Sequence, residues 1–98
     1  MIVERKRAIK PRERVVLMKG NSSIEIKLID ISGANKTRDG DFEIEINGQR
    51  KPLHLSYKDP PYHLTDGVKI KIRKCCGKRV DLGFFGVGEY QLQHYKTG

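Results

Sequence analysis

The side chains of this chain that could act on a ligand are mostly cationic and aromatic, and they occur in clusters. Basic residues adjoin at positions 5–7 and 50–51, and a tyrosine precedes a lysine at 57–58. Lysine and arginine neutralise phosphate groups, whereas tyrosine and histidine rings stack on unpaired bases. This combination indicates a surface that binds a polyanion and not a centre that transforms a substrate.

The hydroxyl, thiol and imidazole groups form no catalytic or metal-binding pattern. None of the serines has the strand–turn–helix context of a nucleophile elbow. Cys75 and Cys76 are adjacent and the histidines lie far apart, so four metal ligands at a familiar spacing are missing. Lys78 is followed by Arg79 and not by serine or threonine, which excludes a P-loop. We therefore expect no enzymatic activity, no metal and no cofactor.

The charge is strongly positive and unevenly placed, with a net value of +8 over 98 residues. Residues 1–20 contain seven Lys or Arg against two acidic residues, residues 21–46 three against six, and residues 47–98 ten against four. Two basic blocks around an acidic middle predict a basic face, which would attract RNA or an acidic protein. No apolar run is long enough to span a membrane and no signal peptide is visible, so we expect a cytoplasmic protein without a membrane partner.

Apolar and polar residues alternate with a period of two, which is typical of half-buried antiparallel strands. The runs that show it are residues 24–28, 42–46, 68–73, 80–82 and 90–93, with 1–3 and 15–18 as further candidate strands. Tight-turn pairs such as Asn47-Gly48 separate these runs. No stretch shows a sustained helical stripe. The sequence therefore predicts one all-β domain over residues 1–98, a small antiparallel barrel or sandwich.

The C-terminal half resembles the carbon storage regulator (CsrA) family over residues 55–96. In that family a strand reading roughly L-T-R-K is followed by a V-x-V-x-V strand, a G-N-x-V-R-L-G hairpin and a last strand that ends V-x-V-H-R. The matching segments here are residues 55–58, 68–72, 77–84 and 89–94. The resemblance implies an RNA-binding protein that controls translation by occupying messenger RNA.

The N-terminal half is similar to the same plan at residues 1–7 and 10–17. If both halves resemble the CsrA family, the chain is a fused pseudo-dimer with half-repeats 1–52 and 53–98. Members of that family are normally strand-swapped homodimers. The resemblance then implies two composite RNA sites. One combines Arg5, Lys6 and Arg7 with Gln93, His94 and Lys96. The other combines Tyr57 and Lys58 with Arg50 and Lys51.

Two other interpretations stay open. PilZ domains bind cyclic di-GMP through an R-x-x-x-R segment and a strand that ends D-x-S-x-x-G. Four arginines lie between positions 5 and 14, and residues 30–35 give D-x-S with asparagine at the final glycine position, so the chain also resembles that family. A third interpretation needs no ligand motif, because a small basic β protein of a phage or mobile element would bind a host protein instead.

Overall fold

Alternating apolar and polar residues form the strands of this protein, because one face of each strand is buried while the other meets water. A computed structural model describes residues 4–32, 39–65, 67–76 and 78–96. The strands in these ranges are β1 (Glu4–Ile9), β2 (Arg14–Lys19), β3 (Ser22–Ser32), β4 (Asp39–Ile46), β5 (Gln49–Ser56), β6 (Tyr62–Thr65), β7 (Val68–Cys76), β8 (Arg79–Phe85) and β9 (Gln91–Tyr95). No helix among these residues is long and apolar enough to cross a membrane.

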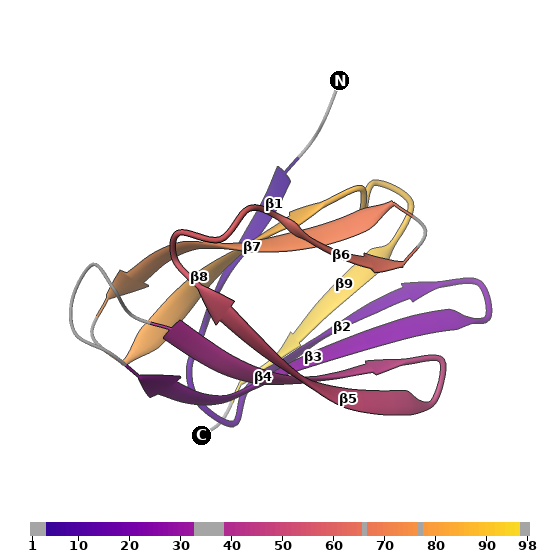
Figure 1. Ribbon diagram of the computed structural model, residues 1–98. Coiled ribbons are helices and arrows are strands. Elements are labelled where there is room, and N and C mark those ends of the chain that lie inside the picture. The colour runs from indigo at the N-terminus through magenta and orange to yellow at the C-terminus, as the bar shows by residue number, and fades with distance from the viewer. Residues whose placement is uncertain (1–3, 33–38, 66, 77, 97–98) are drawn as a thin grey trace.

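The strands pair antiparallel in two sheets that pack face to face (Figure 1). Sheet A has the strand order β1-β8-β7-β6, and sheet B has the order β5-β4-β3-β2-β9. The first and last strands each join the sheet built mainly by the other part of the chain, because β1 pairs with β8 and β9 pairs with β2. Segments at opposite ends of the sequence are thus adjacent in both sheets.

The predicted all-β antiparallel fold is confirmed, and of the two predicted forms it is the sandwich. The sheets do not close into a barrel, because β1 and β6 are the edges of sheet A and β5 and β9 are the edges of sheet B. The boundary between the half-repeats 1–52 and 53–98 falls inside β5. The fused-halves interpretation stays a prediction, and the candidate strand at 1–3 lies outside the described residues.

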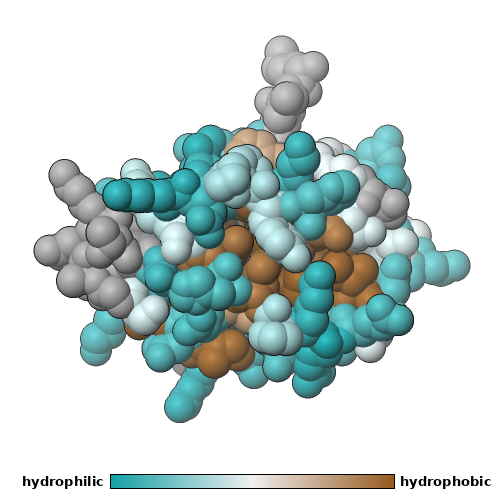
Figure 2. Space-filling view, in the orientation of Figure 1, coloured by the Kyte–Doolittle hydropathy of each residue, from teal (hydrophilic) through white to brown (hydrophobic). Residues whose placement is uncertain are grey.

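The core consists of the inward-facing apolar side chains of both sheets. Its fully buried members include Leu17, Ile26 and Ile44 from sheet B and Ile70, Leu82 and Phe84 from sheet A. Further apolar residues are partly buried at its margin, among them Leu53 of β5 and Leu64 of β6. Figure 2 shows apolar residues reaching the surface near the middle of one face, with hydrophilic residues around them. Since the core takes the inward positions, the polar residues of each strand are left to the two outer faces.

The turn between β4 and β5 fixes the register of one edge of sheet B. Asn47 and Gly48 both have positive φ, at 49° and 88°, as a tight two-residue hairpin needs. Ile46 consequently lies opposite Gln49, and Glu45 lies opposite Arg50. The hairpin therefore places Glu43 and Glu45 of β4 beside Arg50 of β5 on the outer face of sheet B.

Candidate nucleic-acid interface

Positive charge is distributed unequally between the two sheets. The strands of sheet A contain eight Lys or Arg residues against two Asp or Glu residues, whereas the strands of sheet B contain five against six. In sheet A, strand β1 comes from the first basic block of the sequence, and β7 and β8 come from the second basic block. The excess positive charge of the strands therefore lies in sheet A.

Three neighbouring strands build the outer surface of sheet A, and their register sets which side chains share it. Lys6 of β1 lies opposite Gly83 of β8, which in turn lies opposite Lys71 of β7. Directly paired residues point to the same side of a sheet, and their chain neighbours, such as the buried Leu82, point to the other. A β-bulge in β7 between Ile72 and Lys74 lets the adjacent Arg73 and Lys74 lie on the same side. We call this surface the basic face and define it by Glu4, Lys6, Lys69, Lys71, Arg73, Lys74, Asp81 and Phe85.

A bidentate ion pair crosses the middle of the basic face. Arg73 Nε and Nη2 donate to the two carboxylate oxygens of Glu4 at 2.6 and 2.7 Å. The pair passes over Gly83 of the intervening strand, where an added Cβ atom would overlap the Glu4 carboxylate. The hydrogen bonds from Arg73 lower the pKa of Glu4, and the same bonds raise the pKa of Arg73. The guanidinium group is therefore held in one orientation.

The basic face also carries lysines that no carboxylate neutralises. Among the described residues, Lys6, Lys69 and Lys74 are exposed and form no ion pair. Lys71 differs, because its Nζ donates to the backbone oxygen of Asp59 in the turn after β5. Exposed ammonium groups without a carboxylate partner are suited to neutralise the phosphates of a bound polyanion.

Two aromatic side chains lie near Arg73. Its Cζ is 5.5 Å from the centroid of the Phe85 ring, within the range of a cation–π contact. Tyr57, in the turn that follows β5, is 41 % exposed. After the hydrogen bonds and the charge of Glu4, a smaller electrostatic contribution to the raised pKa of Arg73 comes from Tyr57. The contact between Lys71 and Asp59 holds this turn against β7.

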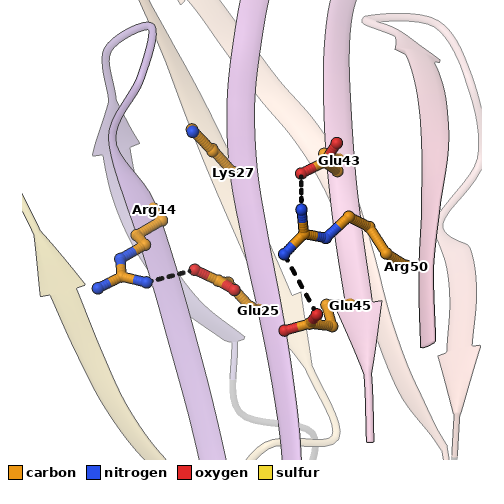
Figure 3. A pocket seen from close by; sticks show the side chains of 6 residues that line it. All are labelled: Arg14, Glu25, Lys27, Glu43, Glu45 and Arg50. Carbon is orange, nitrogen blue, oxygen red and sulfur yellow. Dashed lines mark hydrogen bonds and ion pairs between the residues drawn. The ribbon is translucent and has the colours of Figure 1, made fainter. Parts of the chain in front are cut away.

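The outer face of sheet B carries charges of both signs that are joined in ion pairs. Arg14 lies 2.7 Å from Glu25, and Arg50 lies 3.6 Å from Glu43 and 3.4 Å from Glu45 (Figure 3). Together with a lysine of β3 these side chains line a shallow cavity of about 250 Å³. Cations and carboxylates are equal in number around the cavity, so this face offers little net attraction to a polyanion.

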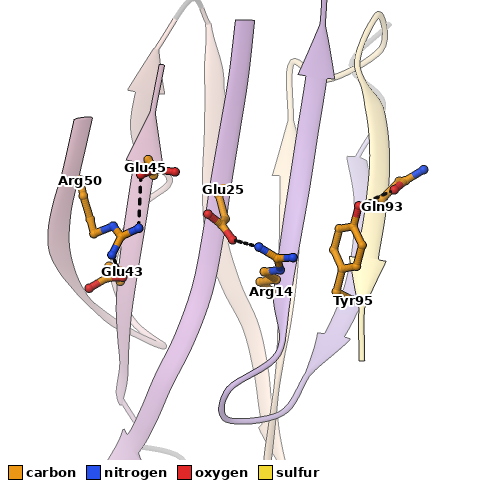
Figure 4. Close-up of polar contacts among 7 residues, drawn as sticks. All are labelled: Arg14, Glu25, Glu43, Glu45, Arg50, Gln93 and Tyr95. Atoms are coloured by element: carbon orange, nitrogen blue, oxygen red, sulfur yellow. Dashed lines mark hydrogen bonds and ion pairs between the residues drawn. The ribbon is translucent and has the colours of Figure 1, made fainter. Parts of the chain in front are cut away.

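We call the outer face of sheet B the charge-balanced face, and its charged residues are Arg14, Glu25, Lys27, Glu43, Glu45 and Arg50. Gln93 and Tyr95 of β9 extend it. The Cζ atom of Arg14 lies 4.6 Å from the centroid of the Tyr95 ring. The Tyr95 hydroxyl donates to Gln93 Oε1 at 2.7 Å (Figure 4). Both side chains are thus engaged with neighbours on the sheet opposite the basic face.

A histidine joins two carboxylates on the outer side of β4 and β5. His54 Nδ1 lies 2.6 Å from Asp41 Oδ1, and Nε2 lies 3.1 Å from Asp39 Oδ2. The hydrogen bonds to Asp41 and then to Asp39 raise the pKa of His54, because they favour the imidazolium form. Within the described residues, no group of three His, Cys, Asp or Glu side chains could hold a metal ion.

The structure separates the basic segment of the first composite site. Lys6 lies on the basic face, as above. Arg5 and Arg7 lie opposite the buried Phe84 and Leu82, on the core side of β1 at the edge of the sheet. Three consecutive strand residues cannot share one face, so only the middle one of this segment faces outward.

The other part of the first composite site lies in sheet B. His94 is half-buried against the buried Glu13, with 3.0 Å between Nε2 and Oε1 and side chains that are 9 % and 4 % exposed. Gln93 lies on the charge-balanced face, and the exposed Lys96 follows the end of β9. The structure therefore does not bring this part together with Lys6.

The second composite site is divided between the two ends of β5. Arg50 is paired with glutamates, and Lys51 Nζ lies 5.8 Å from the centroid of the Tyr62 ring. Tyr57 follows the other end of the strand, about 20 Å away along an extended backbone. Tyr57 and Lys58 are exposed in the turn beside sheet A.

Of the basic face, only Lys6 is among the site residues predicted from the sequence, and Lys69, Lys71, Arg73 and Phe85 are not. The alternation in residues 68–73 does indicate that the lysines share a face, so this part of the basic face was detectable. Continuing the alternation of Val80 and Leu82 places Phe84 on the core side and Phe85 on the outer side, so the outward position of Phe85 was also detectable.

Comparison of the chain with protein-family models, with curated proteins and with solved structures finds no match. The fold and the charge distribution define an antiparallel β-sandwich with one basic outer face. Its resemblance to the CsrA and PilZ families stays a prediction.

Proposed function

We propose that this protein binds RNA through the basic face. The observation that supports the proposal is the imbalance of charge, with eight basic against two acidic residues in the strands of sheet A. Exposed lysines on that face would displace counterions from the phosphate backbone, which favours binding at low salt. Control of translation through a bound messenger RNA is the consequence implied by the resemblance to the CsrA family.

The proposal makes the outer face of sheet A, and not β9, the place of contact. The substitutions Lys69→Glu and Lys96→Glu change the net charge by the same amount. Lys69 lies on the basic face, whereas Lys96 follows β9. We expect Lys69→Glu to weaken binding of a labelled hairpin RNA with a GGA loop by about tenfold and to reduce its salt dependence. Lys96→Glu should change the affinity much less.

The titrations are made at two salt concentrations, with a scrambled loop as a test of sequence preference. Equal losses in the two variants would contradict the assignment to the basic face. Binding of cyclic di-GMP without binding of RNA would replace the proposal by the PilZ interpretation. If neither ligand binds, RNA binding is wrong and docking on a host protein becomes the better hypothesis.

A further inference from the structure

The guanidinium plane of Arg73 is held by Glu4 and is partly open to solvent. Both donors of its Nε–Nη2 edge are engaged by Glu4. Its side chain nevertheless remains 40 % exposed. An arginine in this state has one of its two bidentate edges occupied by a carboxylate, and it keeps a flat surface on which a base can stack.

The surroundings of Arg73 are aromatic on the basic face. Phe85 is partly exposed, with its ring centroid 5.5 Å from Arg73 Cζ. Tyr57 is 41 % exposed in the adjacent turn. Unpaired bases stack on aromatic rings and on guanidinium planes, whereas the bases of a duplex are already stacked on one another.

Lysines surround this group at positions where a sugar–phosphate backbone could pass. Lys69 lies directly opposite Phe85 in the β7–β8 pairing, and Lys6 lies two residues from Glu4 on the same side of β1. Gly83, between β1 and β7, adds no side chain to the surface. The face thus combines a flat centre with cationic margins, which is the arrangement used to bind single strands.

We propose that Tyr57, Arg73 and Phe85 form a stacking platform that makes the basic face selective for unpaired bases of single-stranded RNA. This inference rests on the proposed function, because it names the form of RNA that the same face binds. The lysines supply salt-dependent affinity for any RNA, and the platform supplies the difference between a single strand and a duplex.

The test compares a single-stranded RNA with a duplex of equal length, for the wild-type chain and for Phe85→Leu and Tyr57→Leu. We expect each variant to lose about tenfold in affinity for the single strand and to bind the duplex unchanged. Tyr57→Phe keeps the ring and should bind as the wild type does. Tyr95→Leu removes a tyrosine of similar exposure, 44 %, from the other sheet and should change neither affinity.

Each result bears on one of the two proposals. Unchanged single-strand affinity in both leucine variants, while the wild type binds RNA in a salt-dependent manner, would overturn the platform alone. Equal losses for single strand and duplex would also overturn it, since a stacking role is specific to unpaired bases. If the wild type binds neither RNA, the proposed function and the platform are both wrong. Thermal unfolding of each variant shows that the measurements compare folded proteins.

Discussion

Glu4 and Arg73 come from strands on either side of β8 and are joined by two hydrogen bonds directly over Gly83. On a ligand bound at this face, as proposed, the pair would have two opposing effects. The carboxylate removes one positive charge from the centre of the surface, and its bonds hold the guanidinium flat. Removal of the Glu4 carboxylate should therefore separate the electrostatic part of the proposed RNA binding from the part that depends on the orientation of Arg73.

Glu4→Gln removes the carboxylate charge while keeping a side chain of the same size. We expect the affinity for duplex RNA to rise about two- to fivefold at low salt, because the face gains one unit of positive charge. The preference for a single strand over a duplex should fall, since Arg73 is then held less firmly. Titrations of both RNAs at two salt concentrations measure the two effects separately.

The matched control is Glu25→Gln on the charge-balanced face, where the removed carboxylate also pairs with an arginine at 2.7 Å. It changes the net charge by the same amount in the other sheet. Equal gains in duplex affinity from both substitutions would show a general charge effect and contradict a local role of Glu4. In either variant the lost ion pair is open to solvent, so the stability should change little.

The His94–Glu13 pair should act on stability and not on RNA binding. His94→Ala removes a hydrogen-bond donor from the Glu13 carboxylate, which is almost fully buried. Glu13 Oε1 still accepts a hydrogen bond from the Lys10 backbone N–H. We expect a loss of about 1–3 kcal/mol in the free energy of unfolding, measured by denaturant titration. RNA affinity, measured where the variant is folded, should be unchanged.

His94→Gln keeps an amide that can donate to Glu13, so it should recover part of the lost stability. A large fall in RNA affinity in folded His94→Ala would instead support the first composite site, in which His94 contacts RNA. The same outcome would show that β9 contributes to binding although it lies in sheet B.

Period-two alternation was sufficient to predict the strands whose inner face is fully buried. The runs at 24–28, 42–46 and 68–73 lie within β3, β4 and β7. The strand β1 was not distinguishable by this pattern, because it is an edge strand with only one fully buried residue, Ile9. Charged residues are common on edge strands, where they prevent pairing with other molecules, and they obscure the apolar alternation.

The location of the basic face could be predicted only in part. The two basic blocks were visible in the sequence, and their union in sheet A depends on the pairing of β1 with β8, near the other end of the chain. Sequence-local patterns do not determine such long-range pairing. The first composite site is not assembled for the same reason: the resemblance placed the first strand beside the last, whereas the last strand pairs with β2. The residues of the second site are separated by the length of β5.

His54 should make the stability of the β4–β5 hairpin depend on pH. Its pKa is raised from the ordinary value of 6.5, chiefly by the hydrogen bond to Asp41 and then by that to Asp39. A group with a raised pKa in the folded state stabilises the fold fully below its unfolded value, and this contribution disappears as pH rises through the folded value. The pKa of Asp39 is lowered, chiefly by the Ser56 hydroxyl, so its own contribution disappears instead as pH falls.

We therefore expect His54→Gln to lower Tm most between the ordinary Asp and His pKa values, by about 1–4 °C for so exposed a pair. The difference from the wild type should shrink as pH rises above the raised pKa of His54, because the neutral ring has then lost one of its two donors. His63→Gln, at an exposed position of β6 with no ion pair among the described residues, is the matched control. A Tm difference between His54→Gln and the wild type that stays constant across this range would show that the two aspartates do not hold the imidazolium form.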